Sequence, residues 1–154
     1  MPSLLEFRTQ GVFIWNYGVV TGREILASNR AIYTHDFNGE FVYQVAMNSR
    51  VEEFTAEPDD MRKLADMDRQ FVGLAPLIGV VVAESDYLFG MCRMWNQQAE
   101  TDSFHATVVR RVDEAKELLL GRGIDPGSFE YPPLPQQPDN KTVFYDHAIS
   151  DGDF

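Results

Sequence analysis

The chain has 154 residues, 44% of them hydrophobic, which suits one domain built around a single core. Its formal charge of −11 at pH 7 repels phosphate backbones and anionic lipid surfaces, so nucleic acids and membranes are poor candidate partners. The apolar runs, such as residues 78–83, are too short to cross a bilayer, and the first residues lack the features of a secretory signal. We therefore expect a cytoplasmic protein.

The first half of the chain is predicted to form a hairpin, a helix and a third strand. Aromatic and β-branched residues dominate the two strands of the hairpin. Thr21 and Glu24 have the spacing of a capping box at the start of the helix, although Ser28 and Asn29 interrupt the apolar face of that helix. Turn residues at 36–39 precede the third strand. The expected bounds are 4–9 and 12–20 for the hairpin, 21–33 for the helix and 41–47 for the third strand.

The second half is predicted to alternate helices and strands. Thr55 is a good N-cap for a helix, and Pro58 suits the first turn, where its missing N–H leaves no hydrogen bond unmade. Residues 78–83 form a continuous apolar run, which is typical of a central strand covered on both faces. Residues 88–99 have the clearest amphipathic helical pattern. The expected bounds are 55–71, 85–99 and 112–120 for the helices, and 76–84 and 104–110 for the strands.

The predicted order, β-β-α-β-α-β-α-β-α, indicates an α/β domain over residues 1–123, with a largely parallel sheet that contains one antiparallel hairpin. Residues 124–154 differ, because five of the eight prolines and six acidic residues fall there with a single lysine. This Pro-rich acidic C-terminal tail is expected to be extended or partly disordered. Four of its apolar or aromatic side chains could dock on the domain, namely Tyr131, Leu134, Phe144 and Tyr145.

Residues 78–94 and 104–119 carry a family resemblance. They contain the apolar strand, a helix start of the form Phe-Gly-x-x-Arg-Met and a closing helix with Asp-Glu-Ala-Lys-Glu-Leu-Leu. This arrangement resembles the carboxy half of bacterial SpoIIAA-like proteins, which belong to the STAS (anti-sigma-factor antagonist) superfamily. The resemblance covers about residues 4–120. It implies a mixed sheet of four to five strands with helices mainly on one face. It also implies a non-catalytic, regulatory role in which the domain binds a protein partner or itself.

The resemblance points to Thr55 as a possible phospho-acceptor. In signalling members of the superfamily, a Ser or Thr in the turn before the second helix is phosphorylated by a partner kinase. The corresponding turn here reads Glu53-Phe54-Thr55-Ala56, which keeps an acid and a hydroxyl but lacks the Asp-Ser pair and the glycine. A phosphate at a helix start would be favoured by the helix dipole. The alternative is that Thr55 is only a helix cap.

Phe89 and Met94 fall outside the main apolar stripe of the predicted helix 85–99. Together with Arg93, they are of the residue types enriched in protein interfaces. We therefore predict that Phe89, Arg93 and Met94 contribute to a homodimer or to a surface for a protein partner. The alternative is that Phe89 packs against the tail or a loop.

Two other functions stay open. In one, the domain carries a small apolar ligand between the sheet and the helices, with Phe13, Trp15 or Trp95 lining the pocket. In the other, the protein is an enzyme that uses carboxylates or Cys92, which requires polar groups with perturbed pKa values to converge in one cleft. The three histidines lack metal-binding spacing, and no phosphate-binding glycine pattern is present. We therefore expect no catalytic residue, no metal and no cofactor.

Overall fold

The computed structural model describes residues 3–35, 41–71, 76–134 and 143–146. The elements are β1 (Ser3–Arg8), β2 (Gly11–Val20), α1 (Gly22–Thr34), β3 (Tyr43–Phe54), α2 (Pro58–Phe71), β4 (Leu77–Val82), α3 (Asp86–Ala99), β5 (Phe104–Val109), α4 (Val112–Gly121) and β6 (Val143–Asp146). The predicted α/β class and the predicted order of elements up to α4 are confirmed. The turn predicted at 36–39 and the tail residues 135–142 and 147–154 lie outside the described residues.

The strands form one mixed sheet in the order β5-β4-β3-β2-β1-β6. β1 and β2 pair antiparallel, as predicted for the hairpin, whereas β2, β3, β4 and β5 pair in parallel. β6 lies parallel to β1, with Leu4 opposite Val143, and adds an edge strand from the C-terminal region to the predicted set. β4 is the apolar run noted in the sequence, and it is buried along its whole length between β3 and β5.

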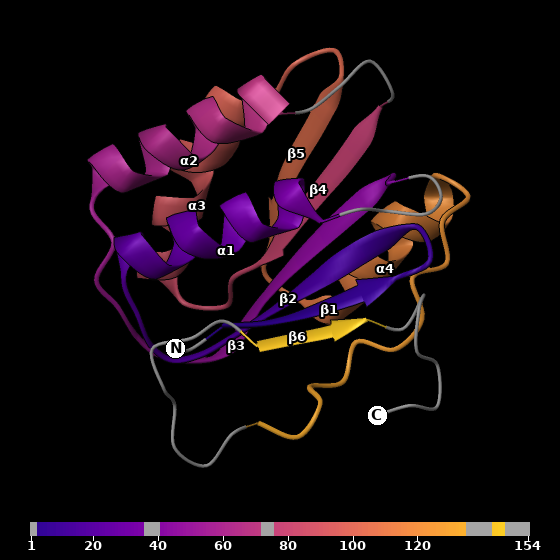
Figure 1. Cartoon of the computed structure of the whole chain (residues 1–154), viewed down its shortest axis with the longest axis horizontal. Helices are drawn as coiled ribbons and strands as arrows, with labels where there is room; N and C mark the ends of the chain where they lie inside the picture. The colour runs from indigo at the N-terminus through magenta and orange to yellow at the C-terminus, as the bar shows by residue number, and fades with distance from the viewer. Residues whose placement is uncertain (1–2, 36–40, 72–75, 135–142, 147–154) are drawn as a thin grey trace.

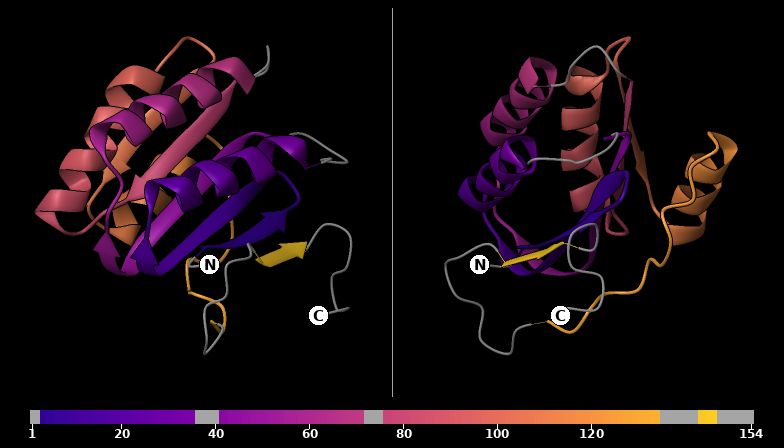
Figure 2. Two further views of the ribbon diagram at one scale, coloured as in Figure 1. Left: turned by 60° about the vertical axis from the view of Figure 1, so that its left-hand side comes forward. Right: turned by 45° about the vertical axis from the view of Figure 1, so that its right-hand side comes forward.

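Helices cover the two faces of the sheet unequally. α1, α2 and α3 lie on one face and α4 lies on the other, so the helices are mainly on one side, as the family resemblance implies (Figures 1 and 2). α2 packs mainly against its neighbours α1 and α3 rather than against the strands. It therefore bridges the two helices above the centre of the sheet. No helix within the described ranges has the length and apolar character that a membrane span requires.

The face that carries α4 is closed by aromatic side chains from β2 and from the segment that follows α4. Phe13 stacks on Trp15 with ring centroids 5.0 Å apart, and Phe129 meets Phe13 edge-on at 5.1 Å. Tyr131 lies against Trp15, and its hydroxyl group donates to backbone carbonyl oxygens of β2 and β3. The first part of the predicted tail, residues 124–134, thus packs on the domain, with Ile124 and Phe129 in the core.

Two helix starts have side-chain caps, and the capping box predicted at the first is confirmed. Thr21 and Glu24 form the capping box of α1: the backbone N–H of Glu24 donates to Thr21 Oγ1, and the backbone N–H of Thr21 donates to the Glu24 carboxylate. At α3, the backbone N–H of Leu88 donates to Ser85 Oγ over 3.2 Å. Both caps satisfy N–H groups that the helices leave without an internal partner.

The predicted cap of α2 is wrong. The helix begins at Pro58, and the backbone carbonyl of Glu57 accepts its first hydrogen bonds. The backbone N–H of Glu57 donates in turn to the Asp60 carboxylate at 2.9 Å. Thr55 lies two residues before this cap, and its hydroxyl donates to the Val20 carbonyl oxygen at 3.5 Å, because Thr55 still runs beside the end of β2.

Candidate functional site

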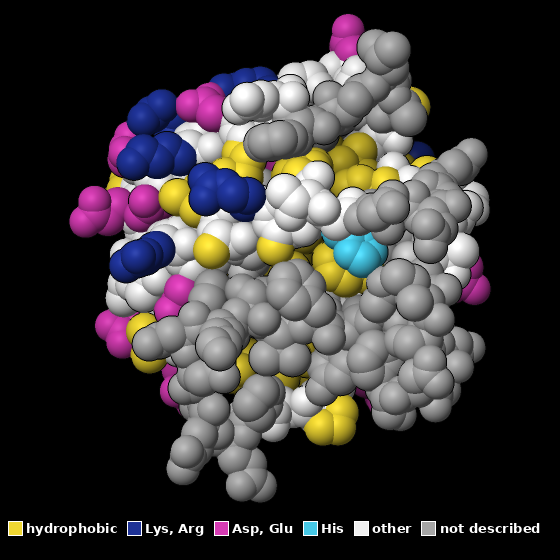
Figure 3. Space-filling view, in the orientation of Figure 1, with side chains coloured by type: hydrophobic (Ala, Val, Ile, Leu, Met, Phe, Trp, Pro, Cys, Tyr) yellow, Lys and Arg dark blue, Asp and Glu magenta, His cyan; other side chains and the backbone are white. Residues whose placement is uncertain are grey.

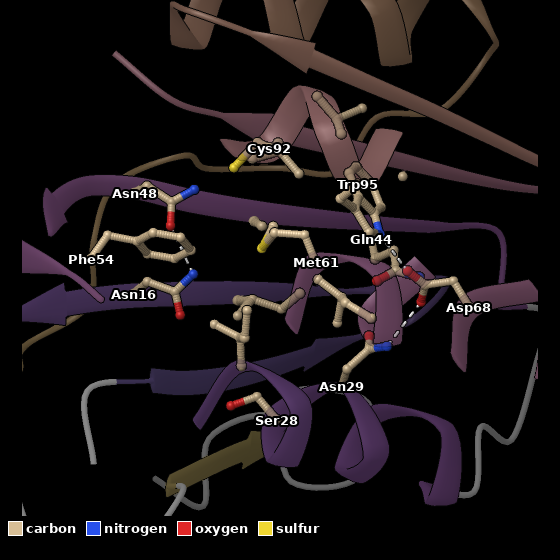
Figure 4. A pocket seen from close by; sticks show the side chains of 17 residues that line it. Asn16, Ser28, Asn29, Gln44, Asn48, Phe54, Met61, Asp68, Cys92 and Trp95 are labelled. Atoms are coloured by element: carbon tan, nitrogen blue, oxygen red, sulfur yellow. Dashed lines mark hydrogen bonds between the residues drawn. The ribbon is translucent and has the colours of Figure 1, made fainter. Parts of the chain in front are cut away.

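A cavity lies between the sheet and helices α1, α2 and α3 (Figure 4). Its volume is about 80 Å³. For scale, an engineered apolar cavity of about 150 Å³ holds benzene. Apolar side chains form most of its wall, among them Ile14, Ile25, Phe54, Met61, Leu64 and Val81. Six polar side chains complete it, namely Asn16, Ser28, Asn29, Gln44, Asn48 and Asp68.

The helices leave part of the central strands uncovered at the cavity. Gly79 of β4, by contrast, is covered closely by Trp95 and Phe104, and a Cβ atom there would come within 2.7 Å of the Phe104 ring. Ile14 and Ala46 lie in the central strands β2 and β3 under the helices, yet both keep part of their surface uncovered. Since protein interiors are normally packed without such gaps, this space is a specific feature of the fold.

The cavity approaches solvent between α1 and α2. Ile25 of α1 and Leu64 of α2 both line it, and both are partly exposed. In the space-filling view, hydrophobic side chains come to the surface of this face along the line between the two helices (Figure 3). An apolar lining that continues to the surface suits the entry of a small molecule.

Polar side chains gather at the two ends of the cavity. Asp68, Asn29 and Gln44 lie at one end and Asn16 and Asn48 at the other, with apolar side chains between them (Figure 4). Pockets for small molecules commonly combine an apolar wall with a few polar groups that fix the orientation of the ligand.

Asp68 of α2 is the central polar group, and only 1% of its surface is exposed. Trp95 Nε1 donates to Asp68 Oδ2 over 2.6 Å. Asn29 Nδ2 and the Tyr33 hydroxyl donate to Asp68 Oδ1 over 2.9 Å and 2.7 Å. All three donors are neutral, and they come from α1 and α3, so Asp68 joins α2 to the helices on both sides of it.

No cation neutralises Asp68 among the described residues. The neighbouring Arg69 is exposed and pairs with Asp66 and with the Gln98 carbonyl. Burial of the carboxyl group raises the pKa of Asp68, and the hydrogen bonds from its three neutral donors and the more distant charge of Arg69 oppose this rise without cancelling it. A buried carboxyl group without a cation is unusual, because removing its charge from water costs on the order of several kcal/mol.

Tyr33 connects Asp68 to the sheet. Gln44 Nε2 of β3 donates to Tyr33 Oη over 3.0 Å, and the same hydroxyl donates onward to Asp68. Burial beside the carboxyl group of Asp68 raises the pKa of Tyr33, so its hydroxyl stays protonated and keeps its role as a donor. The side-chain carbonyl oxygens of Gln44 and Asn29 accept no hydrogen bond from the part of the chain that the structure describes.

The other polar end of the cavity is a ladder of hydrogen bonds across four strands. Ser3 Oγ donates to Asn16 Oδ1 over 2.6 Å, and Asn16 Nδ2 donates to Asn48 Oδ1 over 2.9 Å. Asn48 Nδ2 then donates to the Val82 carbonyl oxygen over 3.0 Å. These groups satisfy one another, so this end is a rigid polar floor rather than a set of free binding groups.

Ser28 of α1 differs from the other polar lining residues. Only 3% of the surface of Ser28 is exposed, and the residue lines the cavity. Its Oγ atom has no hydrogen-bond partner among the described residues. A buried hydroxyl without a partner costs about 1–3 kcal/mol, so such groups are rare in folded proteins.

The structure brings one of the three predicted pocket residues to the cavity. Trp95 lines it, whereas Phe13 and Trp15 lie in the core on the opposite face of the sheet. Alternation along β2 explains this correction: Ile14 and Asn16 face the helices that enclose the cavity, so the residues between them point to α4.

The residues predicted for phosphorylation and for an interface lie away from the cavity wall. Thr55 is exposed in the connection before α2. On α3, Arg93 is exposed, while Phe89 and Met94 are partly buried against the core beneath that helix. The guanidinium group of Arg110 lies 4.2 Å from the centre of the Phe89 ring. The phosphorylation and the interface both stay predictions.

Cys92, His35 and His105, the cysteine and the histidines that the structure describes, are not assembled into a reactive centre. Cys92 lines the cavity, and burial raises the pKa of its thiol to about 12. His35 stacks on Phe7, whereas His105 lies beside Glu100. No group of three His, Cys, Asp or Glu side chains that could hold a metal ion occurs in the described part of the chain. His147 lies outside the described residues.

Comparisons with known proteins add no relative: no family model, no curated protein and no solved structure matches the chain.

Sequence reasoning missed Asp68, Asn29 and Ser28 as site residues. A signal for each was present. Ser28 and Asn29 interrupt the apolar face of α1, and Asp68 falls three residues after Ala65 and four after Leu64 on the apolar stripe of α2. A polar residue on a buried helical face either finds a partner or marks a site.

Proposed function

We propose that this protein binds a small molecule with a mostly apolar body in the cavity between the sheet and helices α1, α2 and α3. The unpartnered hydroxyl of Ser28 carries the proposal, because it is buried and lines the cavity. A ligand with its own polar group would supply the missing hydrogen bond. The stability that this hydroxyl costs the empty protein is then recovered on binding.

The composition of the wall supports the same function. Apolar side chains from six elements surround the space, and most of the polar groups lie at its ends (Figure 4). Burial of apolar ligand surface supplies most of the binding free energy in such a pocket, while a few polar groups select the ligand. The small volume limits the occupant to a few non-hydrogen atoms unless α2 moves outward.

The proposed role is binding without a reaction. With its pKa at about 12, the Cys92 thiol is protonated at neutral pH and is a poor nucleophile. The carboxyl group of Asp68 is held by three donors rather than poised beside a nucleophile. The regulatory role implied by the family resemblance stays a prediction that rests on the sequence alone.

The two tryptophans offer a direct test. Trp95 lines the cavity and Trp15 lies on the opposite face, so their two indole N–H signals in a ¹H–¹⁵N spectrum are a reporter and an internal control. Xenon and isobutanol are suitable probes because both fit a small apolar space. We expect either probe to shift the signal of Trp95 in a saturable way and to leave that of Trp15 in place.

A filled cavity is the matching negative control. Ala46→Val adds two methyl groups inside the cavity wall and should abolish the shift of the Trp95 signal. Thr107→Val puts a valine on β5, outside the cavity wall, and should leave that shift intact. The proposal is wrong if neither probe shifts the Trp95 signal, or if Ala46→Val responds like the unmodified protein.

A further inference from the structure

We infer that the ligand of the cavity is a small amine, bound as a cation whose ammonium group supplies the counter-charge that Asp68 lacks. This inference rests on the proposed function and narrows the class of ligand.

The hydrogen bonds at Asp68 leave room for one more donor. A carboxylate accepts at about four lone-pair positions, two on each oxygen. Asn29 and Tyr33 occupy both positions on Oδ1, whereas Trp95 alone donates to Oδ2. One position on Oδ2 is therefore unfilled, and Asp68 is among the residues that line the cavity.

The groups around this position are acceptors. An ammonium group carries three N–H donors and no acceptor. The side-chain carbonyl oxygens of Asn29 and Gln44 lie at the same end of the cavity as Asp68, and neither has a donor among the described residues (Figure 4). A primary ammonium can thus give one N–H to Asp68 Oδ2 and its others to neighbouring oxygens. A carboxylate or phosphate would place a second negative charge beside Asp68, which like-charge repulsion disfavours.

Electrostatics favour a cation at both short and long range. Asp68 has no Lys, Arg or His within ion-pair distance in the described part of the chain, so an ammonium placed there forms a new pair in a water-poor site. Part of the desolvation cost of this pair is already met by folding, since the carboxyl group is buried without a ligand. The net charge of −11 also concentrates cations near the protein.

An isosteric series separates charge from shape. Isobutylammonium, isobutanol and isobutyrate share one carbon skeleton and differ in the charge and hydrogen bonding of the polar end. Titration of each, followed by the Trp95 indole N–H, reads out the site directly, because this N–H donates to Asp68. We expect isobutylammonium to bind about tenfold more tightly than isobutanol, and isobutyrate to bind more weakly than both.

Two variants test whether Asp68 is responsible. Asp68→Asn removes the charge at the site and should bring the affinity ratio of amine to alcohol to about one. Asp66→Asn removes the same charge from the exposed side of α2 and should leave the ratio unchanged, which controls for attraction by the net charge. If Asp68→Asn does not fold, the ratio in the unmodified protein still decides between the ligand classes.

The possible failures are distinguishable. If isobutanol shifts the Trp95 signal at concentrations equal to or below those of isobutylammonium, the amine inference is overturned and the proposed function stands. A tenfold preference for the amine that persists in Asp68→Asn also overturns the inference, because the preference then comes from another group. If none of the three compounds nor xenon shifts the Trp95 signal, the proposed function fails and the inference fails with it.

Discussion

The two tryptophans lie on opposite faces of the sheet, and each donates its indole N–H to a buried carboxyl group. On the face covered by α4, Trp15 donates to Glu6 over 3.2 Å, and the Arg8 guanidinium pairs with the same carboxylate at 2.7 Å. On the face covered by α1, α2 and α3, Trp95 donates to Asp68, which has no such cation among the described residues. The sequence places a similar pair of groups on both faces, and only one pair is neutralised.

This difference shows which face is built for stability. Around Glu6, Arg8 also lies over the Phe13 ring at 3.8 Å and donates to the backbone carbonyl of Ser128, so charge, aromatic packing and the C-terminal segment close that face together. Around Asp68 the structure leaves a cavity, an uncompensated carboxyl group and the unpartnered hydroxyl of Ser28. Proteins often sacrifice stability in this way where they bind a ligand.

Removal of Arg8 should have the largest effect, since it takes away the guanidinium group that pairs with a buried carboxylate on the α4 face. Arg8→Met breaks the ion pair with Glu6 and releases the C-terminal segment, so we expect a loss of about 3 kcal/mol in the free energy of unfolding. Urea denaturation measures this. Arg62→Met, which breaks exposed ion pairs on α2, should cost less than about 1 kcal/mol. Equal losses in the two variants would contradict the distinction between the faces.

The sequence predicts the layers of this fold better than the space between them. Residues 78–83 identify β4 because an unbroken apolar run needs cover on both faces, and the stripe from Leu88 to Ala99 identifies the buried side of α3. Both signals are local. β6 escapes prediction because its pairing depends on the free edge of β1, which lies far away in the sequence.

The sequence predicts where the candidate site lies but not which polar residues form it. A ligand between sheet and helices follows from the α/β class, and Trp95 falls on the predicted inner face of α3. The partners of Asp68 come from two other helices, α1 and α3, and no periodicity reveals that Asn29, Tyr33 and Trp95 converge on it. Nor does any pattern show that α2 packs on helices rather than on strands and so leaves a cavity.

The pH dependence of stability should also distinguish the two faces. Burial raises the pKa of Asp68 in the folded protein above its unfolded value of about 3.9, so the folded state keeps this proton where the unfolded state has lost it. The free energy of unfolding should therefore fall as the pH rises from about 4 through the folded pKa, by at most about 1.4 kcal/mol per pH unit for this group.

Comparison of Asp68→Asn with the unmodified protein isolates this contribution, because the variant lacks the titrating group. The stability of the unmodified protein relative to the variant should decline as the pH rises above about 4. Asp59→Asn should behave in the opposite sense, since hydrogen bonds from Arg62 lower the pKa of the exposed Asp59 and its contribution is lost as the pH falls. A constant difference between Asp68→Asn and the unmodified protein from pH 4 to 8 would mean that Asp68 titrates normally.

The smallest expected effect is that of Ser28→Ala on the free energy of unfolding, and its sign is informative. Ser28→Ala removes a buried hydroxyl without a partner, so in the absence of ligand it should stabilise the protein by about 1 kcal/mol in urea denaturation. Part of this gain comes from the higher helix propensity of alanine. The reverse change at the adjacent exposed position, Ala27→Ser, measures that part and should destabilise the protein by about 0.5 kcal/mol. If Ser28→Ala stabilises the protein by more than the helix-propensity effect and also weakens the binding of isobutanol, the Ser28 hydroxyl serves ligand binding rather than stability. A loss of stability would instead show that the hydroxyl has a structural partner and that the cavity is only a packing defect.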